Sequence, residues 1–214
     1  MRIAREKFQY YEKEHLSQEN GGWYYKDQKL NLFAAVDFAY SLSKRADYTA
    51  IAVIGINRDH NIYVLEIDRF KTDKISEYFQ HILSLHTKWD FHKIAAEVTA
   101  GQASIVRELK DSYIRPYGLY LSIVDVKPTR HQGSKEERMA AVLEPKYDNN
   151  AVWHYRGGNC QILEDELIST HPAHDDCMDA LANAIDIAVP PQTNQRGRTS
   201  GVVINAKFGG VAFG

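Results

Sequence analysis

Hydrophobic and polar positions between residues 31 and 189 follow two different periods. Runs rich in β-branched and aliphatic residues predict strands, and apolar residues spaced three or four apart predict helices. The turn-forming residues 57–60 predict a hairpin between the second and third strands. The predicted strands are 32–37, 49–56, 61–70, 93–97, 119–126 and 151–155, and the predicted helices are 73–88, 101–112, 134–143, 161–169 and 175–188.

The order of these elements predicts the fold class. Three strands in a meander come first, and strands that alternate with helices follow them. Such an order is typical of a mixed sheet with helices packed against it. No unit of 20–50 residues recurs, which excludes a repeat protein. We therefore expect an α/β fold with a mixed central β-sheet flanked by helices.

The segments on either side of this region have a different composition. Residues 1–30 are polar and aromatic with a break at Gly21 and Gly22, and they predict a helix and a turn in a connecting segment. Residues 190–214 begin with two prolines and continue with polar residues and glycine, which predicts a mobile C-terminal tail. We expect a connecting segment at 1–30, one domain at 31–189 and a tail at 190–214.

Composition excludes several classes of protein. The chain has 214 residues, of which 44% are hydrophobic and 25% charged, as in ordinary globular domains and unlike disordered or fibrous chains. It contains neither an apolar run long enough to span a bilayer nor an apolar signal core. Two cysteines are too few for a disulfide framework or a Cys-rich zinc site. A net charge of −2 excludes binding of nucleic acid by bulk charge, but not by a local groove.

Acidic residues stand where two predicted strands end and where the last helix begins. Asp37 ends the first strand and Glu97 the fourth, each after three small or aliphatic residues. If these strands are neighbours, both acids lie at one edge of the sheet. Asp175, Asp176 and Asp179 begin the last helix, and a helix packed across that edge would bring Asp176 or Asp179 to them.

Such a group of carboxylates points to a metal site. Carboxylates about 4 Å apart repel each other by roughly 4 kcal/mol per pair at an effective dielectric constant of 20. They therefore take up protons or bind hard cations such as Mg²⁺ or Mn²⁺. Two such ions are common in enzymes that hydrolyse phosphodiesters. Each acid taken alone is more often a solvated loop or helix-start residue, so the metal site depends on the whole set.

Four segments that contain these residues resemble a known family. They are VDFAYSLSKRADYTAIAVIG, AAEVTAGQ, SKEERMAAVLEP and HPAHDDCMDALANAI, in this order. Together they resemble the C-terminal nuclease domain of the large terminase subunit of tailed bacteriophages, over about residues 31–188. The resemblance implies the RNase H-like fold, which is also the fold of retroviral integrases.

The resemblance also implies roles for individual residues. It makes Asp37, Glu97 and Asp176 the catalytic acids that bind two Mg²⁺ or Mn²⁺ ions. Asp175 and Asp179 are near alternatives for the third metal ligand. Helix phase leaves the choice between Asp175 and Asp176 open, because they precede Asp179 by four and three positions. The remaining assignments are Asp47 as a further ligand or outer contact, and Lys135 and Arg138 as ligands of the scissile-strand phosphate.

Two neighbouring segments offer further candidates. Residues 127–135 carry four basic groups and no acid, so Lys127 and Arg130 are candidates for contacts to the DNA backbone, with a solvated loop as the alternative. His174 precedes the acid pair and is a candidate outer ligand or proton shuttle, with a solvent-facing position as the alternative.

The function implied by the resemblance is endonucleolytic cleavage of concatemeric double-stranded viral DNA during genome packaging in the host cytoplasm. The implied partners are the terminase small subunit, the portal and an ATPase motor. The chain has no G-x-x-x-x-G-K-[ST] phosphate loop, so we expect the motor on another part of a longer protein or on a separate polypeptide. The alternatives are another RNase H-like nuclease, such as a junction resolvase or transposase core, and a non-catalytic packaging scaffold.

Overall fold

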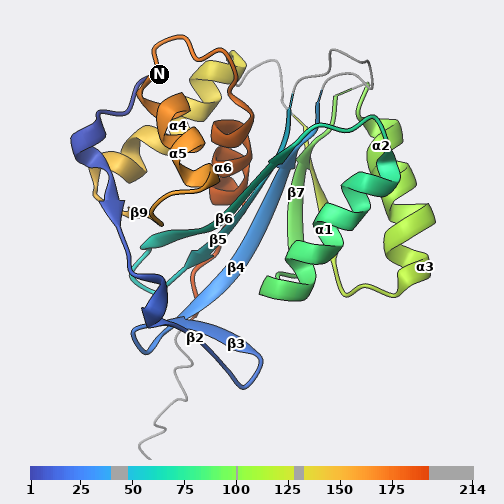
Figure 1. Cartoon of the computed structure of the whole chain (residues 1–214), viewed down its shortest axis with the longest axis horizontal. Coiled ribbons are helices and arrows are strands. Elements are labelled where there is room, and N and C mark those ends of the chain that lie inside the picture. Colours follow the sequence, from blue (N-terminus) through green and yellow to red (C-terminus); the bar gives the residue numbers. More distant parts are fainter. Residues whose placement is uncertain (40–47, 100, 128–132, 193–214) are drawn as a thin grey trace, which may run out of the picture.

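The computed structural model describes residues 1–39, 48–99, 101–127 and 133–192. Its centre is a twisted nine-stranded sheet with helices on both faces (Figure 1). The strands are β1 (Gln9–Tyr10), β2 (Leu16–Glu19), β3 (Gly22–Tyr25), β4 (Gln28–Asp37), β5 (Thr49–Ile56), β6 (Ile62–Phe70), β7 (Lys93–Glu97), β8 (Ser122–Val126) and β9 (Val152–His154). The helices are α1 (Ile75–Trp89), α2 (Ala103–Glu108), α3 (Arg115–Tyr117), α4 (Lys135–Asp148), α5 (Asn159–Ile168) and α6 (Asp176–Asp186).

The sheet is mixed, as predicted. The main order is β1–β9–β6–β5–β4–β7–β8, and the β2–β3 hairpin extends from the beginning of β4. Strands β4, β5 and β6 form an antiparallel meander. Strands β7 and β8 run parallel to β4, and β9 runs parallel to β6. This topology confirms the α/β fold expected from the element order.

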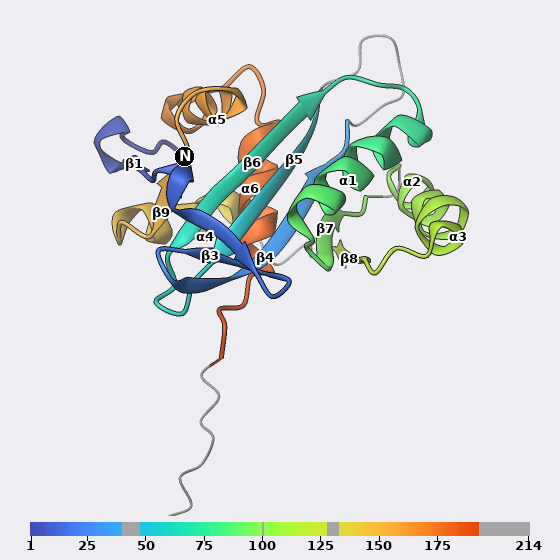
Figure 2. The same cartoon turned by 60° about the horizontal axis from the view of Figure 1, so that its bottom comes forward.

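Helices on both faces explain why the central strands are almost wholly apolar. Every residue of β5 is buried, as are residues 33–36 of β4. Helix α6 packs on β4 and β5 with α4 and α5 behind it, and α1, α2 and α3 lie on the opposite side of the sheet (Figures 1 and 2). Burial from both sides favours continuous aliphatic runs instead of alternation.

Two helices differ from their predicted extents. Helix α4 continues five residues beyond the predicted end at Leu143 and passes through Pro145, to Asp148. Its last turn is held by Tyr147, which is buried and bonded through its hydroxyl to His154 Nε2 at 2.8 Å. The helix predicted at 101–112 is instead divided into α2, a π-helical segment at Leu109–Ile114, and α3. In α4, tertiary packing thus extends the helix beyond the end that the local pattern predicts.

The helix predicted within residues 1–30 is wrong, because this segment forms β1, β2, β3 and two short 3₁₀ turns. Strand β1 pairs in parallel with the distant β9, and the hydroxyl of buried Tyr11 donates to the Val64 carbonyl at 2.9 Å. Two tight turns with positive φ, at Asn20-Gly21 and at Lys26-Asp27, connect β2 to β3 and β3 to β4. Asn-Gly is a strong hairpin signal, and it was available in the sequence.

The structure describes the first residues of the chain, but not most of the predicted C-terminal tail. Residues Ile3, Phe8 and Tyr11 belong to the same hydrophobic core as the central strands. Most of the predicted tail, residues 193–214, lies outside the described residues. Within the described part of the chain, no helix has the length and apolar character needed to cross a membrane.

Candidate functional site

Asp37 and Glu97 lie side by side at one edge of the sheet. Strands β4 and β7 are parallel neighbours, and Val36 is paired with Ala96. Asp37 and Glu97 are the next residues in each strand, and both are partly buried. This adjacency confirms the geometric expectation that the first and fourth predicted strands are neighbours. The carboxyl ends of parallel strands are a common position for functional side chains in α/β folds.

The beginning of α6 brings three more carboxylates to the same edge. Asp176 is the first residue of the helix and is only 6% exposed. It lines a cleft of about 260 Å³ together with Asp37, Glu97 and the half-exposed Asp175. Asp179 follows one turn later and is also buried. Of the two residues that helix phase left open, Asp176 is therefore the one enclosed beside Asp37 and Glu97.

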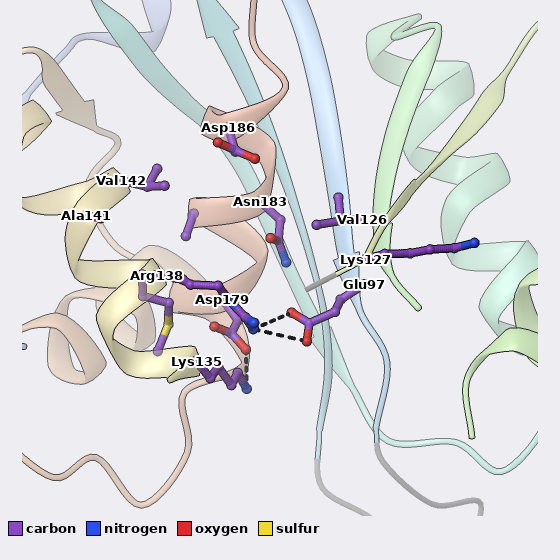
Figure 3. Close-up of a pocket in the computed structure, with 12 residues that line it drawn as sticks. Glu97, Val126, Lys127, Lys135, Arg138, Ala141, Val142, Asp179, Asn183 and Asp186 are labelled. Carbon is purple, nitrogen blue, oxygen red and sulfur yellow. Dashed lines mark hydrogen bonds and ion pairs between the residues drawn. The ribbon is translucent and has the colours of Figure 1, made fainter. Parts of the chain in front are cut away.

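A second pocket, of about 280 Å³, adjoins this cleft. It lies between α4, α6 and the ends of β7 and β8 (Figure 3). Glu97 and Lys135 line both spaces, so the two adjoin at these residues, and together we call them the groove. Asp179 faces the second pocket, together with Arg138 and with apolar residues of α4 and α6.

The N-terminus of α4 fixes the positions of the two basic residues of the groove. Ser134 caps the helix by accepting a hydrogen bond from Glu137 N at 3.2 Å, and Glu137 Oε2 accepts one from Ser134 N at 2.7 Å. This capping box sets the first residue of the helix at Lys135. Arg138 follows three positions later and therefore lies on the same helix face.

Lys135 and Arg138 are both paired with acids of the groove. Lys135 Nζ lies 3.4 Å from Asp175 Oδ2 and makes a closer ion pair with Asp179 Oδ2 (Figure 3). Arg138 Nη2 donates to Glu97 Oε1 at 3.3 Å and Oε2 at 3.5 Å. These two side chains therefore supply positive charge beside the carboxylates of the groove.

The pKa of the Asp37 carboxyl is shifted by its burial and by the charged groups around it. Burial raises the pKa of its carboxyl from 3.8 to about 7. Lys135 opposes the shift, whereas the charges of Asp176, Asp175 and Glu97 add to it. A raised pKa of this size at a cleft is typical of functional carboxyls, although ion-pair networks also produce such shifts.

The donor set of the groove fits a hard divalent cation, because it consists of carboxylate oxygens. The carboxylate oxygens of the groove lie farther from one another than the ligand atoms around a bound metal ion do. Among the described residues, His154, Cys160 and Glu164 are the group whose ligand atoms all lie within 4.8 Å of one another, and none of them lines the cleft. In that buried group His154 already bonds both Tyr147 and Glu164.

The remaining predicted site residues are Asp47, Arg130, Lys127 and His174. Asp47 and Arg130 lie outside the described residues. Lys127 borders the second pocket, but it is exposed and its side chain extends away from Glu97 (Figure 3). His174 lines the cleft, and its Nδ1 lies 4.0 Å from Asp176 Oδ2.

Sequence reasoning missed two polar side chains near the acids, of which Gln102 is buried and lines the cleft. Gln102 Nε2 donates to the Phe38 carbonyl at 3.1 Å, and its Oε1 accepts from Thr99 Oγ1 at 3.2 Å, which ties the loops after β4 and β7 together. Arg69, at the end of β6, places Nη2 3.7 Å from Asp176 Oδ2. Neither position carries a local signal, because each depends on strand order and on the packing of α6.

Comparisons with known proteins agree with this geometry. The family model described as the ribonuclease H-like domain of the bacteriophage T7 terminase matches residues 41–151. The large terminase nuclease of thermophilic phage G20c, in a crystal structure with bound magnesium, is 15% identical with a TM-score of 0.58, over 85% of this chain and 94% of that chain. Its zinc-bound crystal structure is 16% identical with a TM-score of 0.59, over 86% and 96%. A search of curated protein sequences gave no match.

The match to the family model covers the meander from β5, the parallel strands β7 and β8, and α4 with its two basic residues. The similar solved structures extend the same fold over most of the remaining chain. The acids Asp37 and Asp176 lie outside the matched range, yet they meet Glu97 within it in one cleft. The chain therefore belongs to the family of terminases that carry the T7-type ribonuclease H-like domain.

Proposed function

We propose that this protein is a divalent-metal-dependent endonuclease that cuts concatemeric double-stranded viral DNA during genome packaging. One observation carries the proposal: Asp37, Glu97 and Asp176 come from three different elements and line a single cleft. Lys135 and Arg138 lie at the same groove and add basic side chains suited to phosphate. The similar G20c nuclease has been crystallised with bound magnesium, which supports the choice of a hard divalent cation.

The residues of the groove divide into two proposed groups. Asp37, Glu97 and Asp176 hold two Mg²⁺ or Mn²⁺ ions, with Asp179 and Asp175 beside them. When bound, such a pair of ions supplies the charge that activates an attacking water and stabilises the leaving oxygen of a phosphodiester. Lys135 and Arg138 then exchange their carboxylate partners for phosphates of the scissile strand.

The proposed partners and place of action follow from family membership. An ATPase motor, the terminase small subunit and the portal would present the DNA to this domain. The near-zero net charge suits a nuclease whose DNA is delivered by other packaging components. Viral assembly places this activity in the host cytoplasm.

The test is cleavage of supercoiled plasmid with Mn²⁺ or Mg²⁺. We expect nicking and linearisation by the wild-type protein, and none with EDTA or with Asp37→Asn. Asp125→Asn is the matched control, because Asp125 also lies on a strand of the sheet but pairs with Lys110 outside the cleft. Cleavage that persists with EDTA and in Asp37→Asn would contradict the proposed site. Strong preference for a four-way junction over linear duplex would favour a resolvase instead.

Replacement of Lys135 by glutamine is expected to tighten Mn²⁺ binding about 3- to 10-fold. Its ammonium contacts Asp175 and Asp179, so it competes with a metal ion for the same negative charge. The gross interaction of such a pair is about 4 kcal/mol near a protein surface, and solvent reduces it because the side chain is 43% exposed. Isothermal titration calorimetry measures the affinity. Unchanged or weaker Mn²⁺ binding would show that Lys135 does not compete with the metal.

A further inference from the structure

We propose that Arg69 is a positioning residue, which holds the carboxylate of Asp176 in place for metal binding, and that Tyr48 clamps Arg69 for this task. The inference rests on the proposed metal-dependent function and adds two residues to it. Neither residue belongs to the acids or to the basic pair described above. Arg69 lies on β6 and Tyr48 immediately precedes β5, and these two strands lie on the opposite side of β4 from β7.

Arg69 reaches Asp176 from outside the cleft, where it lines a separate pocket with Glu166 and His174. It lies near the end of β6, paired with Ala50 of β5, and its Nη2 is 3.7 Å from Asp176 Oδ2. The side chains of Arg69 and Asp176 are only 11% and 9% exposed. A buried carboxylate needs a nearby positive charge or hydrogen bonds to stay ionised, and Arg69 provides such a charge. So little exposure also makes Arg69 unsuited to direct contact with DNA.

Tyr48 restricts the guanidinium group of Arg69. The Arg69 Cζ atom lies 3.3 Å from the centroid of the Tyr48 ring, which is the geometry of a close cation–π stack. The edge of the His174 ring contacts the same tyrosine, with the ring centroids 5.3 Å apart. Tyr48 immediately precedes β5, so its backbone is anchored to the sheet. Arg69 is therefore held between a fixed ring and Asp176.

A second acid faces Arg69 and Asp176 from α5. Glu166 is 5% exposed and accepts a hydrogen bond from the Met178 N–H, in the first turn of α6, at 2.9 Å. Burial raises the pKa of Glu166 to about 7, with the charge of Asp176 adding to the shift and Arg69 opposing it. Glu166 and Arg69 thus both brace the first turn of α6, where Asp176 is located.

Replacement of Arg69 and replacement of Lys135 are expected to change metal affinity in opposite directions, although both side chains are cations beside the acids. Lys135 approaches from the open side and lies where a metal ion would bind. Arg69 does not line the cleft and is only 11% exposed, and it orients a ligand, a function whose loss typically weakens metal binding 10- to 100-fold. If Arg69 acted only as a competing charge, its removal would tighten binding, as expected for Lys135. The sign of the change therefore separates orientation from competition.

The experiment is titration of metal-free protein with Mn²⁺ by isothermal titration calorimetry, with the fold of each variant checked by circular dichroism. We expect Arg69→Gln to weaken Mn²⁺ binding at least 10-fold and Arg69→Lys to weaken it less. Tyr48→Phe keeps the ring and should bind like the wild type, whereas Tyr48→Ala should bind several-fold more weakly. Lys135→Gln, with the opposite sign, is the matched control.

Three results of this titration would overturn the inference. If Arg69→Gln folds and binds Mn²⁺ as tightly as the wild type or more tightly, the inference is overturned while the proposed function stands. If Arg69→Gln does not fold, the pair Tyr48→Ala and Tyr48→Phe decides, and equal affinities would overturn the inference. If the wild-type protein binds no Mn²⁺, the proposed function and this inference both fail.

Discussion

Replacement of Asp176 by asparagine is expected to lower the rate of metal-dependent DNA cleavage by about 100- to 1,000-fold or more. Asp176 is buried at the start of α6, where it lines the cleft with Asp37 and Glu97 and contacts Arg69. An amide of the same size keeps the packing but removes the negative charge that a divalent cation needs. Initial rates of plasmid nicking at saturating Mn²⁺ measure the loss.

The neighbouring acids provide an internal scale for this prediction. Asp179 is buried and faces the adjoining pocket, so we expect Asp179→Asn to lose less activity than Asp176→Asn. Asp175 is 38% exposed at its side chain, and Asp175→Asn should lose the least. The reverse order, with Asp175→Asn as the most damaging change, would contradict the placement of Asp176 as the metal ligand of α6.

Replacement of Asp37 by asparagine is expected to stabilise the metal-free protein at pH 8 by about 1–3 kcal/mol. The pKa of this carboxyl is raised from 3.8 to about 7, so the folded protein binds the proton more tightly than the unfolded chain does. The resulting contribution to stability is full below about pH 4 and is lost as the pH rises through about 7. Asparagine carries no charge and therefore avoids the destabilisation at high pH. Replacement of an active-site residue commonly increases the stability of the folded protein.

Urea unfolding in EDTA at pH 4 and pH 8 measures this effect. Asp37→Asn should come close to the wild type in stability at pH 4 and exceed it at pH 8. Glu166, whose pKa is also raised to about 7, acts in the same direction and leaves part of the pH dependence in the variant. A lower stability of Asp37→Asn at pH 8 would show that the carboxylate is favourably placed without metal.

The parts of the fold that depend on local pattern could be predicted from the sequence. The apolar runs that became β5 and β7 predicted both strands with their observed bounds. The helix predicted from residue 134 is observed as α4, which begins at Lys135 with Ser134 as its cap. The acids at the ends of strands were also visible, because a charged residue after an aliphatic run is conspicuous.

Long-range pairing could not be predicted in the same way. Strand β1 has only two residues and exists because Gln9 and Tyr10 pair with β9, more than 140 positions later. The contact of Arg69 with Asp176 depends on the packing of α6 against the sheet, which no local period encodes. Helix phase left Asp175 and Asp176 equivalent, and the observed start of the helix separates the half-exposed one from the buried one.

The most direct test of the central claim is a crystal of the protein soaked in Mn²⁺, with the metal located by its anomalous scattering. We expect anomalous peaks in the cleft, with the carboxylates of Asp37, Glu97 and Asp176 as ligands and with Lys135 displaced from Asp179. Anomalous peaks only elsewhere, for example at His154, Cys160 and Glu164, or ion pairs of Lys135 with Asp179 and of Arg138 with Glu97 that persist at saturating Mn²⁺, would contradict the proposed metal site.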